Sequence, residues 1–319
     1  MDTATEVVIS RYAEVRAVLA DPRFTVALAG PGGQDPSMAW LRSQVSRFSE
    51  GPAHERRRLI ATGRLHLIDP DRLRHRAHAR TTTLIERADG RPLDAMADLA
   101  RRVPAAVLGE ALGVEAEALP PAVAVVAGAY FSDQPGDEAA DGAVRRLTEL
   151  FAEVLGTGDP EVVAACIGLL VQAYDSCAGL IGDTLPHVLC EPRPDWTVEA
   201  LMAETLRHDP PLRVMRRVAQ SGAELGGHRL PEGTVVLLDL VAAHRDPAVF
   251  TDPDRFDPGR GGPPHLTFGD GLRPCPGVAH ALQLAAGVIT AVGERCRLST
   301  PDLADEALLT TARLEVIAR

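Results

Sequence analysis

The stretch from residue 265 to residue 282, HLTFGDGLRPCPGVAHAL, decides how the rest of the chain is interpreted. It opens as a glycine-rich loop and continues as an apolar helical run, and Cys275 stands at the junction between two prolines. Glycines let a backbone turn tightly and approach a flat group closely. The pattern places Pro276 at the first helical position, where orphan N–H groups and the helix dipole favour a cysteine thiolate. An anionic sulfur can bind a metal ion, whereas a lone cysteine beside a turn is more often buried and inert.

Size and composition indicate a globular protein. The chain has 319 residues, 45% of them hydrophobic, which is enough for a large buried core. A net charge of -11 argues against general binding to nucleic acid or to anionic membranes. The N-terminus begins with acidic and polar residues, and no run of eighteen apolar residues occurs, so we expect a cytoplasmic protein. The five cysteines form no C-x-x-C pair, so neither a disulfide framework nor a zinc module is predicted.

Hydrophobic periodicity predicts a mainly helical chain with small antiparallel sheets. Helices are expected over 11–20, 54–68, 72–88, 94–112, 142–155, 161–182 and 197–208. β-Prone runs on either side of Gly226-Gly227 predict a small antiparallel sheet. The proline- and glycine-rich segment 245–264 is expected to be an ordered irregular loop, and 307–317 a short β-like tail. We expect one domain over residues 1–319.

The opening stretch contains Phe268-Gly269-x-Gly271-x-Arg273-x-Cys275-x-Gly277. This resembles the heme-binding loop of the cytochrome P450 family, F-G-x-G-x-R-x-C-x-G. The resemblance implies that Cys275 is the axial ligand of a heme b iron. It also implies cofactor contacts for Phe268, Gly269, Arg273 and Gly277. A thiolate ligand pushes electron density onto iron and favours O–O cleavage, which suits oxygen activation.

Two further motifs follow the family order. Glu204-Thr-Leu-Arg207 matches E-x-x-R, and Pro253-Asp-Arg255-Phe256 looks like P-x-R-F. The resemblance implies that Glu204, Arg207 and Arg255 form an ion network that pins the irregular loop against a helix. For Glu204 and Arg207 alone, a solvated surface pair is the alternative.

The resemblance also identifies cationic residues that would contact the two propionate carboxylates of the heme. His54 and Arg58 lie four residues apart and share a helical face, similar to the family's H-x-x-x-R helix that holds the heme propionates. By the same resemblance, Arg217 ahead of the sheet and Arg273 in the loop are propionate contacts. Arg56 and Arg57 are interpreted as surface charge.

The family match loosens in LLVQAYDSCAGLIGD, residues 169–183, which resembles the oxygen-binding helix built on A/G-G-x-E/D-T-T. Alignment places Ala173 at the groove glycine, Asp175 at the acid and Ser176 at the alcohol. The resemblance implies that Asp175 and Ser176 relay protons to bound oxygen. A local hydrogen bond or a buried salt bridge is the alternative for Asp175.

The chain is short for this fold. The segment VVISRYAEVRAVLADPRF looks like the one that follows the family's first sheet strands, so part of the N-terminal region is expected to be missing. The intervals on both sides of Asp175 also look compressed. We therefore expect a cytochrome P450-like fold that is shortened at the N-terminus, in the lid helices and after the oxygen-binding helix, which affects the substrate pocket.

The resemblance implies a heme-thiolate monooxygenase or oxidase that takes electrons from a ferredoxin. Its substrate would be a small molecule or a short or carrier-held peptide in a biosynthetic pathway. Basic clusters at 56–58 and 72–80 could steer an acidic donor, with a solvated helix face as the alternative for 72–80. Two other functions stay open: a non-catalytic relative that activates a partner such as a glycosyltransferase, and a peroxide-using or oxidative-coupling heme enzyme. The sequence does not specify the substrate.

Overall fold

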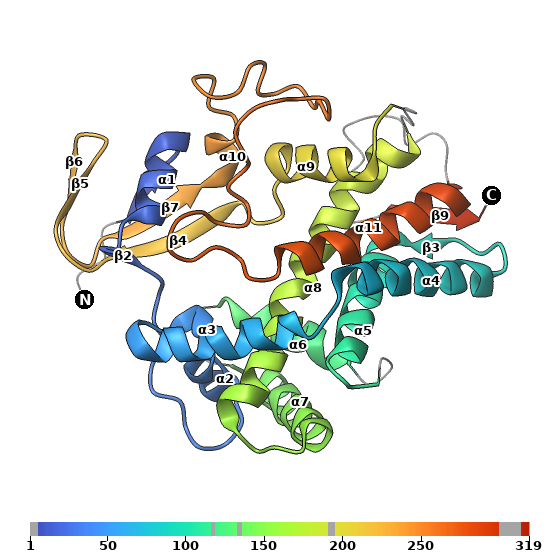
Figure 1. Ribbon diagram of the computed structural model, residues 1–319, viewed down its shortest axis with the longest axis horizontal. Coiled ribbons are helices and arrows are strands. Elements are labelled where there is room, and N and C mark those ends of the chain that lie inside the picture. Colours follow the sequence, from blue (N-terminus) through green and yellow to red (C-terminus); the bar gives the residue numbers. More distant parts are fainter. Residues whose placement is uncertain (1–5, 116–118, 133–135, 191–194, 300–313, 319) are drawn as a thin grey trace. The chain divides into compact units, whose positions relative to one another are not determined.

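A computed structural model describes residues 6–115, 119–132, 136–190, 195–299 and 314–318. Helices dominate and the sheets are small, as predicted (Figure 1). The chain forms two compact units: unit 1 comprises 1–28 and 203–275, and unit 2 comprises 29–202 and 276–319. The single domain over residues 1–319 stays a prediction.

Unit 1 is built on a four-stranded sheet in the order β1-β7-β4-β2. Its strands are β1 (Glu6–Ile9), β2 (Phe24–Thr25), β4 (Val214–Ala219) and β7 (Val235–Asp239). β1 runs parallel to β7, and the other neighbours are antiparallel. The start of VVISRYAEVRAVLADPRF, which we expected to follow the first strands, therefore supplies a strand itself. A separate hairpin, β5 (Ala223–Leu225) and β6 (His228–Leu230), turns at Gly226-Gly227, where the sequence predicted a turn.

The core of unit 1 lies between the sheet, α1 (Tyr12–Ala20) and the short α10 (Leu240–Ala243), which the sequence pattern did not predict. α1 ends directly before Asp21, because the residue before a proline avoids helical dihedrals. The Tyr12 ring meets Phe250 edge-on at 5.6 Å, and its hydroxyl donates to the Pro264 carbonyl at 2.7 Å. These contacts attach the irregular segment 245–264, which contains no helix or strand, to the core.

Unit 2 is mostly helical. Its elements are α2 (Met38–Gln44), the 3-10 turn η1 (Ser46–Phe48), α3 (Gly51–His66), α4 (Pro70–Ala88), the π-helical η2 (Ala95–Arg101), α5 (Arg102–Ala111), α6 (Pro120–Tyr130), α7 (Glu138–Leu155), α8 (Pro160–Leu189) and α11 (Val278–Arg295). α9 (Val198–His208) begins in unit 2 and ends in unit 1. A three-stranded sheet, in the order β3-β9-β8, consists of β3 (Leu93–Asp94), β8 (Cys296–Leu298) and β9 (Glu315–Ala318). β9 coincides with the end of the predicted tail, of which residues 307–313 lie outside the described residues.

α8 is the central helix of unit 2, and its run VVAACIGLLVQAY is apolar almost all round. It packs against α2, α3, α5, α6, α7, α11 and η2 (Figure 1). Within the described residues, α8 is the helix with the length and composition of a membrane span. The helices packed around α8 account for that composition, because 56% of the apolar window is buried inside the protein.

We expected the chain to be shortened on both sides of Asp175. The interval before Asp175 contains further helices, and the interval after it contains a short connection. Between α5 and α8 the chain forms α6 and α7, and α6 was not predicted. Between α8 and α9, residues 190–197 make the connection. α11 packs on α4 so closely that a Cβ at Gly287 would lie 2.4 Å from the Arg74 carbonyl oxygen.

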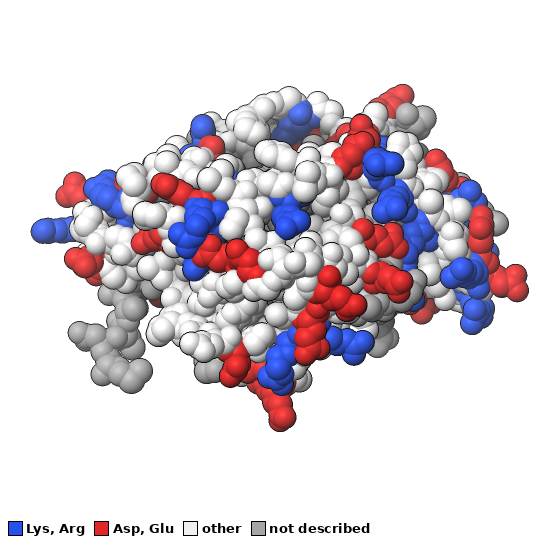
Figure 2. Space-filling model, turned by 60° about the horizontal axis from the view of Figure 1, so that its bottom comes forward, with Lys and Arg blue, Asp and Glu red and all other residues white. Residues whose placement is uncertain are grey.

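Many surface charges of the protein are paired locally. Figure 2 shows acidic and basic side chains side by side on the face that it draws. At the start of α8, Glu161 accepts from Arg56 at 2.7 Å through both of its oxygens, and from Arg57 Nε at 2.9 Å. Arg57 is largely buried, so its interpretation as plain surface charge was wrong. The hydrogen bonds of Arg56, then those of Arg57, lower the pKa of Glu161 to about 2.

This ion cluster predicts a pH-dependent contribution to stability. A carboxylate with a depressed pKa stabilises the fold fully above its ordinary pKa of 4.5 and loses that effect as the pH falls to about 2. Glu161→Gln should therefore lower the free energy of unfolding by about 1 kcal/mol at neutral pH, and by less as the pH falls through this window. Denaturant titrations at several pH values measure this. Glu55→Gln, at an exposed position of α3, is the control, and a difference that does not change with pH would contradict the prediction.

Candidate heme-binding site

Two backbone hydrogen bonds shape the cysteine loop in unit 1. The Gly269 amide donates to the Leu266 carbonyl at 2.8 Å, and the Cys275 amide donates to the Phe268 carbonyl at 2.8 Å. Gly269 and Gly271 have φ values of 75° and 72°, which glycine adopts without strain. The loop closes on itself and presents Cys275 as an exposed side chain at its end.

The last turn of α1 lies directly against this loop. The Leu272 amide donates to the Leu19 carbonyl at 3.2 Å. A Cβ at Gly271 would lie 2.5 Å from the same oxygen, so only glycine fits there. Arg16 Nε donates to Asp270 Oδ2 at 2.7 Å, and this hydrogen bond lowers the pKa of Asp270. The sequence analysis did not identify Arg16 or Asp270, because Asp270 occupies a variable position of the motif.

The helix after the cysteine begins later than expected. α11 starts at Val278, with Gly277 as its N-cap, and the Ala281 amide donates to the Gly277 carbonyl at 2.9 Å. Pro276 lies in the preceding turn, so its assignment to the first helical position was wrong. Proline lacks an N–H and suits both places, which is why sequence did not distinguish them. Cys275 thus lies in the approach to the helix N-terminus and outside its first turn.

Glu204 and Arg207 form the predicted pair, and both are buried. Arg207 Nε donates to Oε2 of Glu204 at 2.9 Å, and Nη2 donates to Oε1 at 2.7 Å. Arg207 also donates to the carbonyls of His244 at 3.0 Å, Pro253 at 2.7 Å and Arg255 at 3.2 Å. The pair therefore pins the irregular loop to α9, as expected from the resemblance. A solvated surface pair does not describe it.

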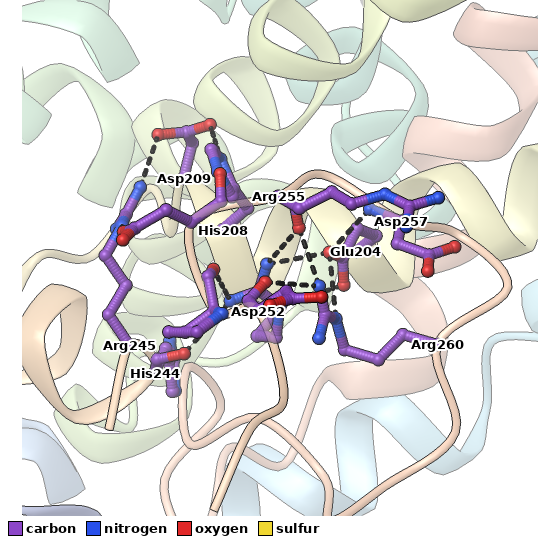
Figure 3. Close-up of polar contacts among 12 residues, drawn as sticks. Glu204, His208, Asp209, His244, Arg245, Asp252, Arg255, Asp257 and Arg260 are labelled. Atoms are coloured by element: carbon purple, nitrogen blue, oxygen red, sulfur yellow. Dashed lines mark hydrogen bonds and ion pairs between the residues drawn. The ribbon is translucent and has the colours of Figure 1, made fainter. Parts of the chain in front are cut away.

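The third member of the network is Arg260, and the prediction of Arg255 side-chain pairing was wrong. Arg255 is exposed, and its guanidinium makes no ion pair with any described residue; only its carbonyl oxygen joins the network. Arg260 Nε lies 3.3 Å from Glu204 Oε1, and its Nη2 donates to the carbonyls of Arg255 at 2.6 Å and Asp252 at 3.0 Å. Figure 3 shows both arginines. The P-x-R-F match found the right segment, but the direction of a side chain in an irregular loop depends on tertiary structure.

The predicted propionate contacts are divided between the two units. In unit 1, Arg217 is buried on β4, donating to the Arg216 carbonyl at 2.9 Å, and Arg273 is half-buried in the loop. In unit 2, His54 lies in the first turn of α3, and Arg58 follows one turn later; both are half-buried. The Nδ1 atom of His54 bonds the Ser46 carbonyl at 3.0 Å, which makes Nδ1 the protonated nitrogen.

Asp175 and Ser176 are exposed on α8. Asp175 Oδ1 lies 3.6 Å from Arg101 Nε of η2. This contact is an exposed ion pair and not a buried salt bridge. The Ser176 hydroxyl donates to the Gln172 carbonyl at 3.1 Å. Beside them, burial raises the pKa of Tyr174. Arg101 was missed, because no sequence pattern links it to a residue on a distant helix.

The donor set fits a heme. A single sulfur side chain is exposed at the end of a glycine-rich loop, as an iron–thiolate ligand must be. Arginine has the planar donor geometry that binds carboxylates, so Arg217 and Arg273 of unit 1 suit propionate groups chemically. Among the described residues, no three His, Cys, Asp or Glu side chains gather to hold a metal ion.

The contact between α1 and the loop predicts the effect of a methyl group at Gly271. Gly271→Ala should cost at least about 2 kcal/mol, from positive φ and from overlap with the Leu19 carbonyl, and should lower heme content. Heme-to-protein ratio and denaturant unfolding measure both effects. Gly261→Ala, with no atom within 4 Å of its new Cβ, is the matched control. Equal heme content in the two variants would refute the role given to this contact.

The ion network predicts opposite results for its two arginines. Arg260→Ala should destabilise the protein by about 2 kcal/mol, because it leaves loop carbonyls and the buried Glu204 with fewer donors. Arg255→Ala should change stability by less than about 0.5 kcal/mol, because only its backbone is used. Denaturant titration of both variants tests this, and a larger loss for Arg255→Ala would reverse the assignment.

Known proteins are similar to this chain in sequence and in fold. The family model for cytochrome P450 matches residues 197–311. Cytochrome P450 monooxygenase PikC of Streptomyces venezuelae is 30% identical, over 92% of this chain and 77% of its own. The mycinamicin IV hydroxylase/epoxidase of Micromonospora griseorubida is 29% identical, over 92% and 83%. The crystal structure of P450BioI with an acyl carrier protein that carries hexadec-9Z-enoic acid has a TM-score of 0.80 at 22% identity, covering 98% of this chain and 92% of that one. The chain therefore belongs to the cytochrome P450 family.

Proposed function

We propose that this protein is a monooxygenase that contains heme b and receives electrons from a ferredoxin. Its substrate would be a small molecule or a carrier-held peptide of a biosynthetic pathway, and its location the cytoplasm. Family membership makes it a heme-dependent oxidoreductase of the monooxygenase type. The observation that carries the proposal is the cysteine loop, whose glycines, hydrogen bonds and exposed Cys275 are all present.

The chain's own residues would divide the work of holding the cofactor. Cys275 would ligate the iron, and Arg217, Arg273, His54 and Arg58 would bind the propionates. Bound heme iron activates oxygen, and a thiolate ligand supports this by donating electron density. Because buried carboxylates need compensating charge, the cationic residues would also determine how firmly the cofactor is held.

The exposure of Asp175 and Ser176 on α8 supports a role for these two residues in proton supply. An exposed carboxylate exchanges protons with water, and a hydroxyl can both accept and donate one. Arg101 attracts the Asp175 carboxylate at 3.6 Å and so restricts its position. We propose that Asp175 collects protons from solvent and that the Ser176 hydroxyl passes them on.

The basic cluster at 72–80, proposed to steer an acidic electron donor, is less basic than its sequence suggested. Three arginines of α4 already pair with glutamates: Arg74 with Glu199, and Arg76 and Arg80 with Glu110. Local pairing reduces the field that would steer an acidic partner, which favours the solvated-face interpretation of residues 72–80. The ferredoxin proposal therefore rests on family membership. Turnover with ferredoxin and its reductase is compared with turnover with peroxide. This comparison distinguishes oxygen-dependent from peroxide-dependent oxidation.

The relatives' names support the substrate class. One is a hydroxylase/epoxidase of mycinamicin IV, and P450BioI was crystallised with an acyl carrier protein. Both point to biosynthetic oxidation of a small or carrier-held molecule. A non-catalytic helper has less support, because the loop that presents Cys275 is intact.

The axial-ligand assignment predicts the spectrum of a cysteine variant. Reduced wild-type protein with carbon monoxide should show the red-shifted Soret band of a thiolate ligand. Cys275→Ala should lose this band and oxidative turnover while it keeps its helical circular dichroism, because Cys275 is exposed and lies outside the helices. Cys190→Ala, at the other exposed cysteine, is the control and should keep both. A thiolate band that persists in Cys275→Ala would exclude the assignment.

A further inference from the structure

A buried histidine of unit 1 holds the segment that leads into the cysteine loop. His244 follows the last residue of α10 and is fully buried. Its Nε2 accepts a hydrogen bond from the Leu266 amide at 2.7 Å. A backbone amide can only donate, so Nε2 carries no proton here and the neutral ring is protonated at Nδ1.

The three residues that begin with Leu266 connect His244 to Cys275. The Leu266 amide is fixed by His244, and the Thr267 hydroxyl donates to the Leu206 carbonyl of α9 at 2.6 Å. The carbonyl of Phe268 then accepts from the Cys275 amide at 2.8 Å. One short segment is thus held from α10 and α9, and the backbone of the cysteine is attached to it.

His244 also joins this segment to the ion network. Its carbonyl oxygen accepts from Arg207 Nη1 at 3.0 Å, and Figure 3 shows it beside the Glu204 cluster. The sequence motifs treat the network and the cysteine loop as separate features. In the structure, the backbone of His244 belongs to the ion network, and its ring supports the cysteine loop.

The surroundings keep the ring neutral. The titratable and charged groups that face it are His265, with ring centroids 6.2 Å apart, and the arginines Arg207 and Arg245. Burial, then the neighbouring His265 ring and the two arginines, lower the pKa of His244 to about 3. Among the described residues, Nδ1 has no hydrogen-bond partner. Burying an unpaired nitrogen is costly, so the acceptor at Nε2 is the feature that distinguishes histidine from an apolar side chain here.

We propose that His244 is a positioning residue for the heme thiolate. Its neutral imidazole fixes the Leu266 amide and, through the Phe268 carbonyl, sets the direction in which Cys275 presents its sulfur. The inference rests on the proposed heme-thiolate function and extends it to a residue outside the cysteine motif. Without the acceptor at Nε2, the loop would stay attached but could tilt. The iron–sulfur bond would then weaken, whereas the fold would persist.

Two variants at this position test the proposal in heme-loaded protein. His244→Leu removes the acceptor, and His244→Gln replaces it with an amide oxygen. In the reduced carbon monoxide complex, His244→Leu should lose more than half of the thiolate band to the shorter-wavelength form, with heme content unchanged. His244→Gln should recover most of that band. The heme reduction potential should shift in His244→Leu and return towards the wild-type value in His244→Gln.

His208→Leu is the matched control. The His208 ring also joins two parts of unit 1, through a bond from Nε2 to the Asp254 carbonyl at 2.9 Å, but its hydrogen bonds go to Asp209 and Asp254 and not to the segment 266–268. It should keep the full thiolate band. A full band and an unchanged potential in His244→Leu would overturn the proposal. A wild-type protein without the band would instead refute the proposed function.

Hydrogen exchange decides the case in which His244→Leu does not load heme. In the wild type the Leu266 amide should exchange slowly, because it is bonded to a buried acceptor. Protection of Leu266 that persists in His244→Gln, together with a thiolate band in that variant, would support the proposal. A Leu266 amide that exchanges at the rate of an exposed amide in the wild type would overturn it.

Discussion

The hydrogen bond from the Cys275 amide to the Phe268 carbonyl is the constraint on which unit 1 depends. It closes a loop that no regular element contains, so its neighbours must hold it. α1 supports it through the Leu19 carbonyl, and α9 and α10 support the segment before it. Elements that are far apart in sequence therefore converge on this loop, because a cysteine on an irregular loop has a defined direction only if the loop itself does.

Local sequence signals predicted much of the fold, and they failed where tertiary contacts decide. The helix expected over 11–20 ends where α1 ends, ahead of Pro22, and the helix expected over 161–182 lies within α8. α6 was missed because its Pro-Pro start and apolar composition carry no periodic signal, and α10 has only four residues. In the same way, E-x-x-R spacing on one helical turn predicts the Glu204–Arg207 pair. No local rule says whether Arg255 or Arg260 turns inward in an irregular loop.

The distal helix shows how one element combines packing with chemistry. Half of the residues of α8 are buried, and Asp175 and Ser176 lie on an exposed stretch of it. Residue types there could be read from the sequence, since an acid and an alcohol stand at the expected positions. The partner could not, because Arg101 reaches Asp175 from η2. Ion pairs between helices depend on packing angles that a one-dimensional pattern does not contain.

The buried arginines explain how the loop 245–264 stays ordered without helix or strand. Buried carbonyl groups need donors, and regular structure normally supplies them. Here Arg207 uses all five of its N–H groups: two bond Glu204, and three bond the carbonyls of His244, Pro253 and Arg255. Arg260 adds bonds to the carbonyls of Thr251, Asp252 and Arg255. A lysine has three donors on one atom and could not span this set, so the planar fork of arginine is what replaces secondary structure beneath the cysteine loop.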